Sequence, residues 1–546
     1  MQISISRGNP SGASRRGDRL LAVILAVSSF IFLGLALLSL HWRLGLDSPI
    51  FLYIAFLMDR FHSVPYRDIF DVNPPGAYFL NWGIGKILGY DDFAYRIADL
   101  VYLAAVLATT AGVMKKFGWK VAWAGSVIFG LLYLGYGPAM SLERDYLLVL
   151  PLALALWVST CLPRLPAPVK GAATGLLFGL AAFVKPQAAM ALPIFLVYQW
   201  LESRPAAKLT PLPLRRLGLF LGAALAGLAV PLAAGAWYLA DNGAWPYFRE
   251  MVLNYWPLYN QLTRTRQVLS GTARVLYLVR GWLSLGQNPA WLFPALFGSV
   301  VSLAYAGRSA PEKRIVGLLL ALTVCFSLYP VIPGKFFFYH WILFYYCAIL
   351  LGALGFVRGS RWSALEPVLL AVLLLLTVVG HRTSDSAPGG PRKILRQAAG
   401  LVLHPRATLA RIGAQTLAPP KGGRVDEIAA YLKLQLQPGD RVQALDWTGG
   451  ALQAMLLARA QPATPFLYDV EFYHHVSHPY IQDLRRRFIA DLQLSPPRFI
   501  VEVEAADKPF VQGPDTTATF PELREILQRD YAVAWSEEDF RIYRRK

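Results

Sequence analysis

The chain has 546 residues, of which 55% are hydrophobic, 13% are aromatic and only 16% are charged, and its formal net charge is +19. About a quarter of the residues in a soluble domain are charged, so this composition excludes an ordinary soluble domain and indicates an integral membrane protein. The positive charge falls in short loops between apolar segments, which favours a lipid bilayer or a phosphate-bearing partner over nucleic acid.

The predicted elements begin with a basic tail, residues 1–19. The apolar run that follows is too long for the core of a signal peptide and precedes many similar runs. A bilayer core of about 30 Å requires about 20 apolar residues in a helix, and residues 20–380 contain about eleven such runs. They predict an all-α polytopic membrane bundle. The predicted spans are residues 20–40, 96–114, 119–137, 145–162, 171–185, 187–201, 217–239, 289–306, 315–333, 339–357 and 363–380.

Basic residues concentrate in alternate loops between these spans. By the positive-inside rule such loops are cytoplasmic, which places the N-terminus inside and, with an odd number of spans, the C-terminus outside. We therefore expect a multi-pass protein of a bacterial inner membrane with an extracytoplasmic, periplasmic C-terminal region. The basic residues are Arg15, Arg16, Arg19, Lys115, Lys116, Lys120, Arg164, Lys170, Arg204, Lys208, Arg215, Arg216, Arg308, Lys313, Arg314, Arg358 and Arg361.

Two long segments, residues 41–95 and residues 240–288, then fall on the outer side of the membrane. Both are rich in Trp, Tyr, Phe and Arg rather than in Ser, Gly and Lys. This composition predicts interfacial helices that lie on the membrane rather than free loops.

The C-terminal part divides into a connector and a soluble unit. Residues 381–422 are rich in Pro, Gly and Arg and contain one amphipathic helix near residues 391–414. Residues 423–546 have balanced charges and alternate helical with extended segments, so we predict a small α/β domain. Its predicted helices are near residues 425–436 and 520–529, and its strands near residues 441–446, 498–504 and 540–543.

Charged residues near membrane depth are functional candidates. Asp47 lies just beyond the first span, where it fits either a functional carboxylate or the N-cap of a helix that begins at Ser48-Pro49. Asp71 and Asn73 form a second polar cluster before a Pro-Pro-Gly turn. Glu143 and Asp145 flank an arginine and fit either a site for a divalent ion or a basic substrate group, or a loop that neutralises itself.

Cations are expected on the same side. Lys185 and Lys335 stand near span ends, where a lone lysine can also snorkel toward the interface. Tyr339 and His340 follow Lys335. Arg264 and Arg266 belong to a group of arginines in the second long segment. Several cations beside several carboxylates on one face fit a phosphate-bearing ligand.

Histidines in the C-terminal domain have a metal-like spacing. His474, His475 and His478 lie near Asp469 and Glu471. Two interpretations stay open for them, a metal site on a helix and a surface loop.

In this order, the motifs resemble one family. They are Asp47 outside the first span, the segment PYRDIFDVNPPGAYFL, Glu143-Arg144-Asp145 before the fourth span, FGLAAFVKPQAAMALP and GKFFFYHWIL. The set resembles the C-type (GT-C) membrane glycosyltransferases. Within them it is most similar to bacterial relatives of protein O-mannosyltransferases, aminoarabinose transferases and lipopolysaccharide-core galacturonosyltransferases.

The resemblance implies a helical bundle whose outer interfacial helices form a cavity. It implies a sugar donor on polyprenyl phosphate, hexosyl or pentosyl transfer to a glycan, lipid or protein acceptor on the outer side, and Asp47 as the catalytic base. Asn73 stands where many aminoarabinose transferases have a lysine, which argues against an aminoarabinose donor. No cofactor is assigned, and a divalent metal at Glu143 and Asp145 stays open. The expected substrate-binding residues are Asp71, Asn73, Glu143, Asp145, Lys185, Arg264, Arg266, Lys335, Tyr339 and His340.

Two other functions stay open on the sequence. A polyprenyl-linked glycan ligase or polymerase would use a large outer loop with Arg and His and would need no Asp after the first span. A transporter of lipid-linked substrates would show internal repeats with interrupted helices near the bilayer midplane.

Overall fold

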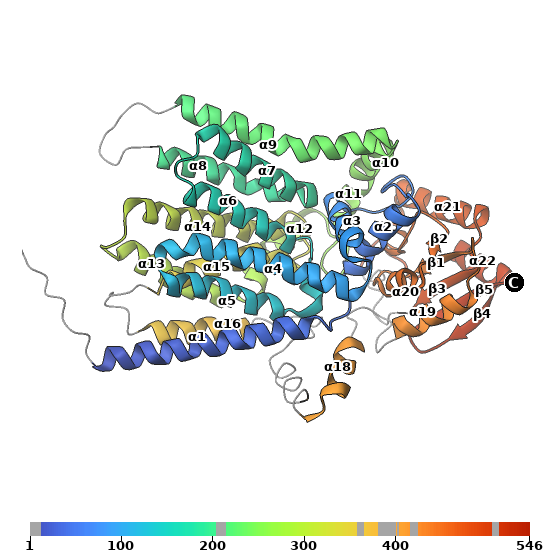
Figure 1. The fold of residues 1–546 in the computed structure, drawn as a ribbon. Coiled ribbons are helices and arrows are strands. Elements are labelled where there is room, and N and C mark those ends of the chain that lie inside the picture. The colour runs from blue at the N-terminus through green and yellow to red at the C-terminus, as the bar shows by residue number, and fades with distance from the viewer. Residues whose placement is uncertain are drawn as a thin grey trace, which may run out of the picture.

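The computed structural model describes residues 12–203, 214–356, 365–379, 400, 403–414, 424–504 and 513–546. A helical bundle forms one end of the molecule and a small domain with a β-sheet forms the other, with short helices between them (Figure 1). Within the described ranges, five helices are long and apolar enough to cross a membrane, judged by length and composition. They are Leu20–Ser39, Asp92–Phe117, Ala167–Val184, Leu214–Asp241 and Ala310–Val331. The protein is therefore a multi-pass membrane protein.

Each predicted span overlaps a helix of the bundle, which confirms the all-α fold. α8 has only 11 residues and follows a 3₁₀ turn, Pro186–Ala191, so it is too short to cross a bilayer by itself. The helices are α1 (Gly12–Ser39), α4 (Asp92–Met114), α5 (Trp119–Gly135), α6 (Val149–Cys161), α7 (Ala167–Val184), α8 (Leu192–Glu202), α9 (Leu214–Asp241), α13 (Leu292–Ala304), α14 (Ala310–Leu328), α15 (Ile342–Ala353) and α16 (Glu366–Val379).

α15 forms the centre of the bundle. It is apolar on all sides and every one of its residues is buried, which is the pattern of a helix surrounded by other helices. It packs against α5, α13 and α14. A hydroxyl contact with α4 joins Tyr346 Oη to Thr110 Oγ1 at 2.8 Å.

α7 and α9 pack closely because small residues face each other. Gly171, Gly175 and Gly179 recur every fourth residue of α7 and lie against the backbone of α9. A Cβ atom on Gly175 would overlap the carbonyl oxygen of Ala224. Small residues at this spacing let two helix backbones approach in a membrane, where the hydrophobic effect does not drive helix association.

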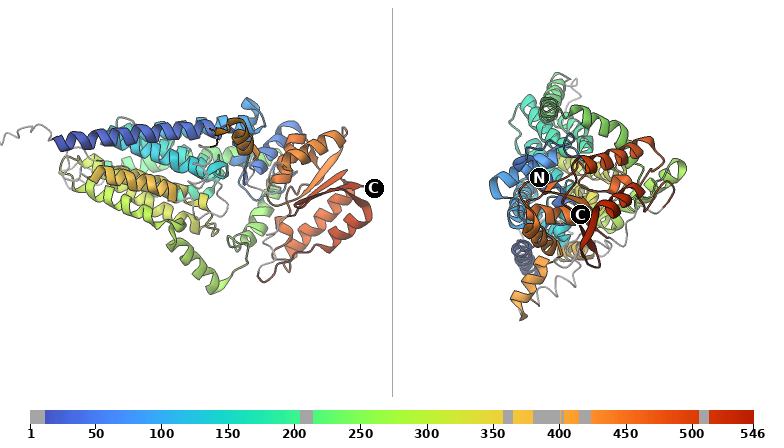
Figure 2. Two further views of the ribbon diagram at one scale, coloured as in Figure 1. Left: turned by 90° about the horizontal axis from the view of Figure 1, so that it is seen from below. Right: turned by 90° about the vertical axis from the view of Figure 1, so that its right-hand side faces the viewer.

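The two outer segments form short helices between the bundle and the C-terminal domain (Figure 2). They are α2 (Ser48–Arg60), α3 (Gly76–Leu88), α10 (Trp245–Glu250), α11 (Trp256–Tyr259) and α12 (Gly271–Leu283). α2 is covered by protein: its residues from Ser48 to Leu57 are buried, and it packs on α3 and the C-terminal domain. α12 instead exposes Val275, Leu276 and Leu283, as expected of a helix that lies on a membrane.

The C-terminal domain is a five-stranded sheet with helices. Its strand order is β2-β1-β3-β5-β4; β1 pairs in parallel with β2 and β3, and β5 pairs antiparallel with β3 and β4. The α/β prediction is confirmed, although it omitted β2, β4, α20 and α21. The elements are α19 (Arg424–Gln435), β1 (Arg441–Leu445), α20 (Gly450–Ala458), β2 (Gln461–Pro462), α21 (Pro479–Leu494), β3 (Phe499–Val503), α22 (Pro521–Asp530), β4 (Tyr531–Ser536) and β5 (Phe540–Arg545).

The predicted connector is only partly described, with α18 at Pro405–Ala414. Several basic residues used for the orientation lie outside the described residues or have undescribed side chains. They are Arg15, Arg16, Arg19, Arg204, Lys208, Arg358 and Arg361.

Candidate functional site

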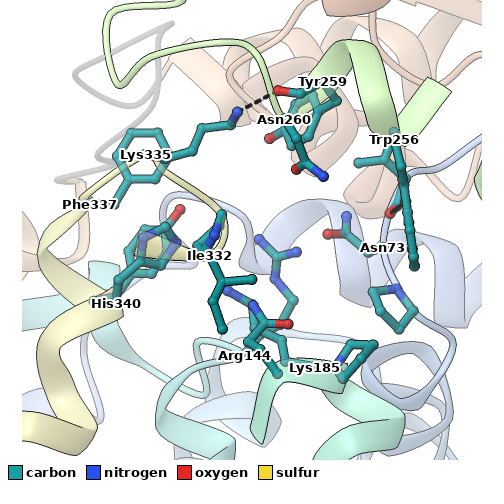
Figure 3. Close-up of a pocket in the computed structure, with 16 residues that line it drawn as sticks. Asn73, Arg144, Lys185, Trp256, Tyr259, Asn260, Ile332, Lys335, Phe337 and His340 are labelled. Atoms are coloured by element: carbon teal, nitrogen blue, oxygen red, sulfur yellow. Dashed lines mark hydrogen bonds between the residues drawn. The ribbon is translucent and has the colours of Figure 1, made fainter. Parts of the chain in front are cut away.

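A cavity of about 410 Å³ lies where the bundle meets the two outer segments (Figure 3). Its wall combines cationic, aromatic and amide side chains from loops that follow different helices. The lining residues are Val72, Asn73, Pro74, Arg144, Lys185, Pro186, Gln187, Trp256, Tyr259, Asn260, Ile332, Pro333, Lys335, Phe337, Tyr339 and His340.

Lys335 reaches the cavity from the loop after α14. Its side chain is 2% exposed, and Nζ donates hydrogen bonds to the carbonyl oxygens of Tyr259 at 2.7 Å and Leu262 at 3.2 Å. Within the described part of the chain Lys335 forms no ion pair. Burial lowers the pKa of Lys335 well below its usual value, and the nearby Arg266 and Arg274 lower it further. An anion entering the cavity would stabilise the charged form of this lysine.

Lys185, across the cavity, has a counter-ion. It is the first residue after α7, and its Nζ lies 2.5 Å from Asp145 Oδ2. Tyr329 donates a second hydrogen bond to Asp145 Oδ1 at 2.7 Å. All three side chains are buried, so Asp145, which lies behind the wall, fixes the position of the lining residue Lys185. Burial lowers the pKa of Lys185, and the charge of Asp145 opposes that shift.

Asp47 lies behind a third cation. Arg144 lines the cavity, and its Nη2 is 2.8 Å from Asp47 Oδ2. Asp47 precedes α2 at the N-cap position but makes no side-chain capping hydrogen bond. Its side chain is 31% exposed, and it does not itself line the cavity.

Glu143 is a weaker partner of the same arginine. Its Oε1 is 3.5 Å from Arg144 Nε, and the residue is 2% exposed. Burial, together with the charge of Asp47, raises the pKa of Glu143 to about 8. Burial therefore disfavours the charged form of Glu143, and the shorter of the two carboxylate contacts of Arg144 is the one with Asp47.

Hydroxyl groups fix the two loops that carry these residues. Tyr95 Oη, on the first turn of α4, lies 3.1 Å from both Ser48 Oγ and the Ser141 carbonyl oxygen. Ser48 Oγ also donates to that carbonyl oxygen at 3.2 Å. The loops containing Asp47 and Arg144 are thus tied together a few residues from their ion pair.

Asp71 shapes the wall but does not line it. Its Oδ1 accepts hydrogen bonds from the backbone N and the side-chain Nδ2 of Asn73, at 2.8 and 2.7 Å, and from the hydroxyl of Tyr78. Tyr468 of the C-terminal domain donates to the other oxygen at 2.7 Å. Asp71 is 1% exposed and serves to orient Asn73, which does line the cavity.

The structure brings most of the predicted site residues to one place. Asn73, Lys185, Lys335, Tyr339 and His340 line the cavity. Asp47, Asp71, Glu143 and Asp145 lie directly behind that wall, through the contacts given above. Arg264 and Arg266 do not line this cavity, and their role in substrate binding stays a prediction.

Sequence reasoning missed several lining residues. Arg144 is one of them, and its position between two carboxylates, Glu143 and Asp145, is the sequence signal that marks it. Trp256, Tyr259 and Asn260 come from the second outer segment, and nothing in the sequence distinguishes them from the other aromatic and amide residues there.

Among the described residues, no group of three or more His, Cys, Asp or Glu side chains could hold a metal ion. Of the two interpretations of the histidines, a surface loop does not fit His474 and His475, which are 0% and 5% exposed. Their Nδ1 atoms lie 2.9 Å apart, and His474 Nε2 is 3.0 Å from Tyr255 Oη.

No protein-family model and no curated protein matches this sequence. Solved structures do match its fold. The crystal structure of ArnT from Cupriavidus metallidurans bound to undecaprenyl phosphate aligns with a TM-score of 0.55 and 16% identity, covering 95% of this chain and 97% of that chain. The apo structure of that ArnT aligns with a TM-score of 0.53 and 15% identity, covering 96% and 98%.

The chain therefore has a fold of the GT-C type, the class that the motifs resembled. The match runs through the bundle, the outer helices and the C-terminal domain, because it covers almost the full length of both chains. At this identity the likeness establishes the fold alone.

Proposed function

We propose that this protein is a membrane glycosyltransferase that transfers a sugar from a polyprenyl-phosphate donor to an acceptor on the extracytoplasmic side. The observation that carries the proposal is the cavity itself, where Arg144, Lys185 and Lys335 converge beside aromatic side chains. The fold supports it as well, since the ArnT structure of the same fold is bound to undecaprenyl phosphate.

The electrostatics fit a lipid phosphate. Among the described residues Lys335 has no carboxylate partner, and Arg144 reaches the cavity from its pair with Asp47, so both can approach an anion. A phosphate leaving group needs such positive charge as it accumulates negative charge. Arg144 is also the link through which a bound phosphate and the Asp47 carboxylate would be held in one arrangement.

In the proposed reaction Asp47 is the general base. As the acceptor oxygen forms a bond to the anomeric carbon of the sugar, the carboxylate takes the hydroxyl proton. The bond from the anomeric carbon to the phosphate oxygen breaks, and the polyprenyl phosphate leaves with the electron pair.

Replacement of Asp47 by Asn tests this role. We expect Asp47→Asn to fold, because Asp47 makes no side-chain capping hydrogen bond that the change could remove. It should still bind undecaprenyl phosphate, because the amide oxygen of Asn can accept a hydrogen bond from Arg144 Nη2 as Asp47 Oδ2 does. Loss of the proton acceptor should lower the transfer rate about 10²–10⁴-fold. The measurement is transfer by purified protein together with its thermal unfolding midpoint.

Asp68→Asn is the matched control. Asp68 lies in the same outer segment, and its ion-pair partner is the exposed Arg67. Its replacement should leave transfer near the wild-type rate. If Asp47→Asn also transfers sugar at nearly the wild-type rate, Asp47 is not the base and its role is limited to holding Arg144.

A further inference from the structure

One loop of the C-terminal domain is inserted against the site. It comprises residues 463–478, connects β2 to α21, and is named here the 463–478 loop. Phe70 N donates to the Pro465 carbonyl oxygen at 2.9 Å, and the rings of Phe70 and Phe466 lie 5.3 Å apart. Tyr468 Oη then donates a hydrogen bond to Asp71 Oδ2 at 2.7 Å. The loop thus holds the first outer segment where that segment enters the cavity wall.

The same loop also holds the second outer segment. His474 Nε2 is 3.0 Å from Tyr255 Oη, and His475 Nε2 is 3.3 Å from Gln261 Oε1. Tyr255 stacks on Tyr259, with ring centroids 5.9 Å apart, and Lys335 Nζ lies 4.0 Å from the Tyr259 ring centroid. These contacts lead from the C-terminal domain to the lysine that we assign to the donor phosphate.

The two held segments also touch each other at the cavity. Trp256 Nε1 donates to the Val72 carbonyl oxygen at 2.8 Å. Val72, Asn73 and Trp256 all line the cavity, so this hydrogen bond lies in the wall itself. Movement of either segment would change the shape of the cavity around Asn73.

We propose that the 463–478 loop is a positioning element of the cavity, and that Tyr468 acts through Asp71 to fix Asn73 toward the ligand. The link to a lipid phosphate rests on the proposed function, whereas the link from Tyr468 to Asn73 does not. Asp71 is fully buried and accepts hydrogen bonds at both oxygens, so the loss of one donor should loosen the turn that it orders. The C-terminal domain is then a structural part of the binding site and not an independent module.

Tyr468→Phe in the full-length protein tests the proposal, because it removes one hydroxyl and keeps the ring. Two quantities are measured: hydrogen–deuterium exchange of residues 69–76, and affinity for undecaprenyl phosphate. We expect faster exchange in that segment and about 2- to 10-fold weaker binding, the effect of one net hydrogen bond. Tyr531→Phe is the control, since Tyr531 donates one buried hydroxyl bond to the Pro497 carbonyl oxygen in the same domain, away from the cavity.

A second experiment distinguishes a positioning role for Tyr468 from a general loss of stability. In an Asn73→Ala background, Tyr468→Phe should weaken binding no further, because its effect passes through Asn73. The proposal would be overturned if Tyr468→Phe and Tyr531→Phe changed the exchange rate of residues 69–76 equally. It would also be overturned if neither variant changed that rate. Faster exchange in Tyr468→Phe with no binding of undecaprenyl phosphate by the wild-type protein would support the positioning role and overturn the proposed function instead.

Discussion

At the scale of single residues, two lysines at one cavity differ in what surrounds them. Lys185 is buried 2.5 Å from a fully buried carboxylate, Asp145. Lys335 is also buried, but its polar contacts within the described ranges are with carbonyl oxygens and an aromatic ring. A buried cation with a counter-ion contributes to the folded structure, whereas one that lacks a counter-ion gains most when an anion binds.

We predict that replacing Lys335 by Met affects lipid binding, whereas replacing Lys185 by Met affects stability. Lys335→Met should keep the wild-type unfolding midpoint and bind undecaprenyl phosphate about 10- to 100-fold more weakly, because a charge-assisted contact is lost. Lys185→Met should lower the unfolding midpoint, because it leaves Asp145 buried without its cation, at a cost of about 3–5 kcal/mol.

A second replacement separates these effects. Lys185→Met combined with Asp145→Asn removes the unpaired charge and should recover most of the lost stability. Lipid affinity and thermal unfolding are measured on the same preparations. Unchanged affinity in Lys335→Met would remove that residue from the phosphate site.

At the scale of elements, the packing of α7 on α9 depends on glycine. A Cβ atom at Gly171, Gly175 or Gly227 would overlap backbone atoms of the facing helix, and backbone cannot move aside as a flexible side chain can. α7 ends at the cavity lysine Lys185, and α9 leads into α10 and the second outer segment. This contact therefore helps to place two parts of the cavity wall relative to each other.

We predict that Gly175→Ala separates these helices and destabilises the protein by about 1–3 kcal/mol, as overpacking does elsewhere. Gly222→Ala on α9 is the control, because a Cβ atom there would meet nothing within 4 Å. Thermal unfolding of both variants in detergent is the measurement. A Gly175→Ala protein as stable as Gly222→Ala would show that the two helices can move apart at no cost.

At the scale of the whole molecule, successive loops lie alternately at the two ends of the helical bundle. α5 and α7 begin at the end of the bundle far from the C-terminal domain (Figure 1). In the first turns of these helices, Lys120 pairs with Glu366 at 2.7 Å and Lys170 with Glu202 at 3.2 Å. The cavity, both outer segments and the C-terminal domain lie at the other end. The positive-inside rule assigns the first of these ends to the cytoplasm.

We predict that a membrane-impermeant maleimide, applied to intact spheroplasts, labels the Leu494→Cys variant and not the Lys115→Cys variant. Leu494 is 84% exposed in the C-terminal domain, and Lys115 follows α4 at the far end of the bundle. The wild-type protein, with Cys161, Cys325 and Cys347 inside helices, gives the background. The reverse labelling pattern would contradict both the orientation and the side of the proposed reaction.

The amino-acid sequence by itself determined the elements. Apolar runs long enough for a bilayer predict helices whatever their neighbours are, and all five predicted strands and helices of the C-terminal domain are present. Local chemistry also marked Asp47, Lys185 and Lys335, because charges beside apolar runs are rare. The GT-C type of fold followed from the order of the motifs.

Only the tertiary structure decided which of these residues meet. Sequence order cannot reveal that Arg144 rather than Asp47 faces the cavity, that Asp145 is committed to Lys185, or that Arg264 and Arg266 stay outside the wall. It also gave no sign that Tyr468 would reach Asp71, because the two residues are 397 positions apart. Contacts between distant segments depend on how helices pack and on which backbones can approach closely, and neither is encoded in a local pattern.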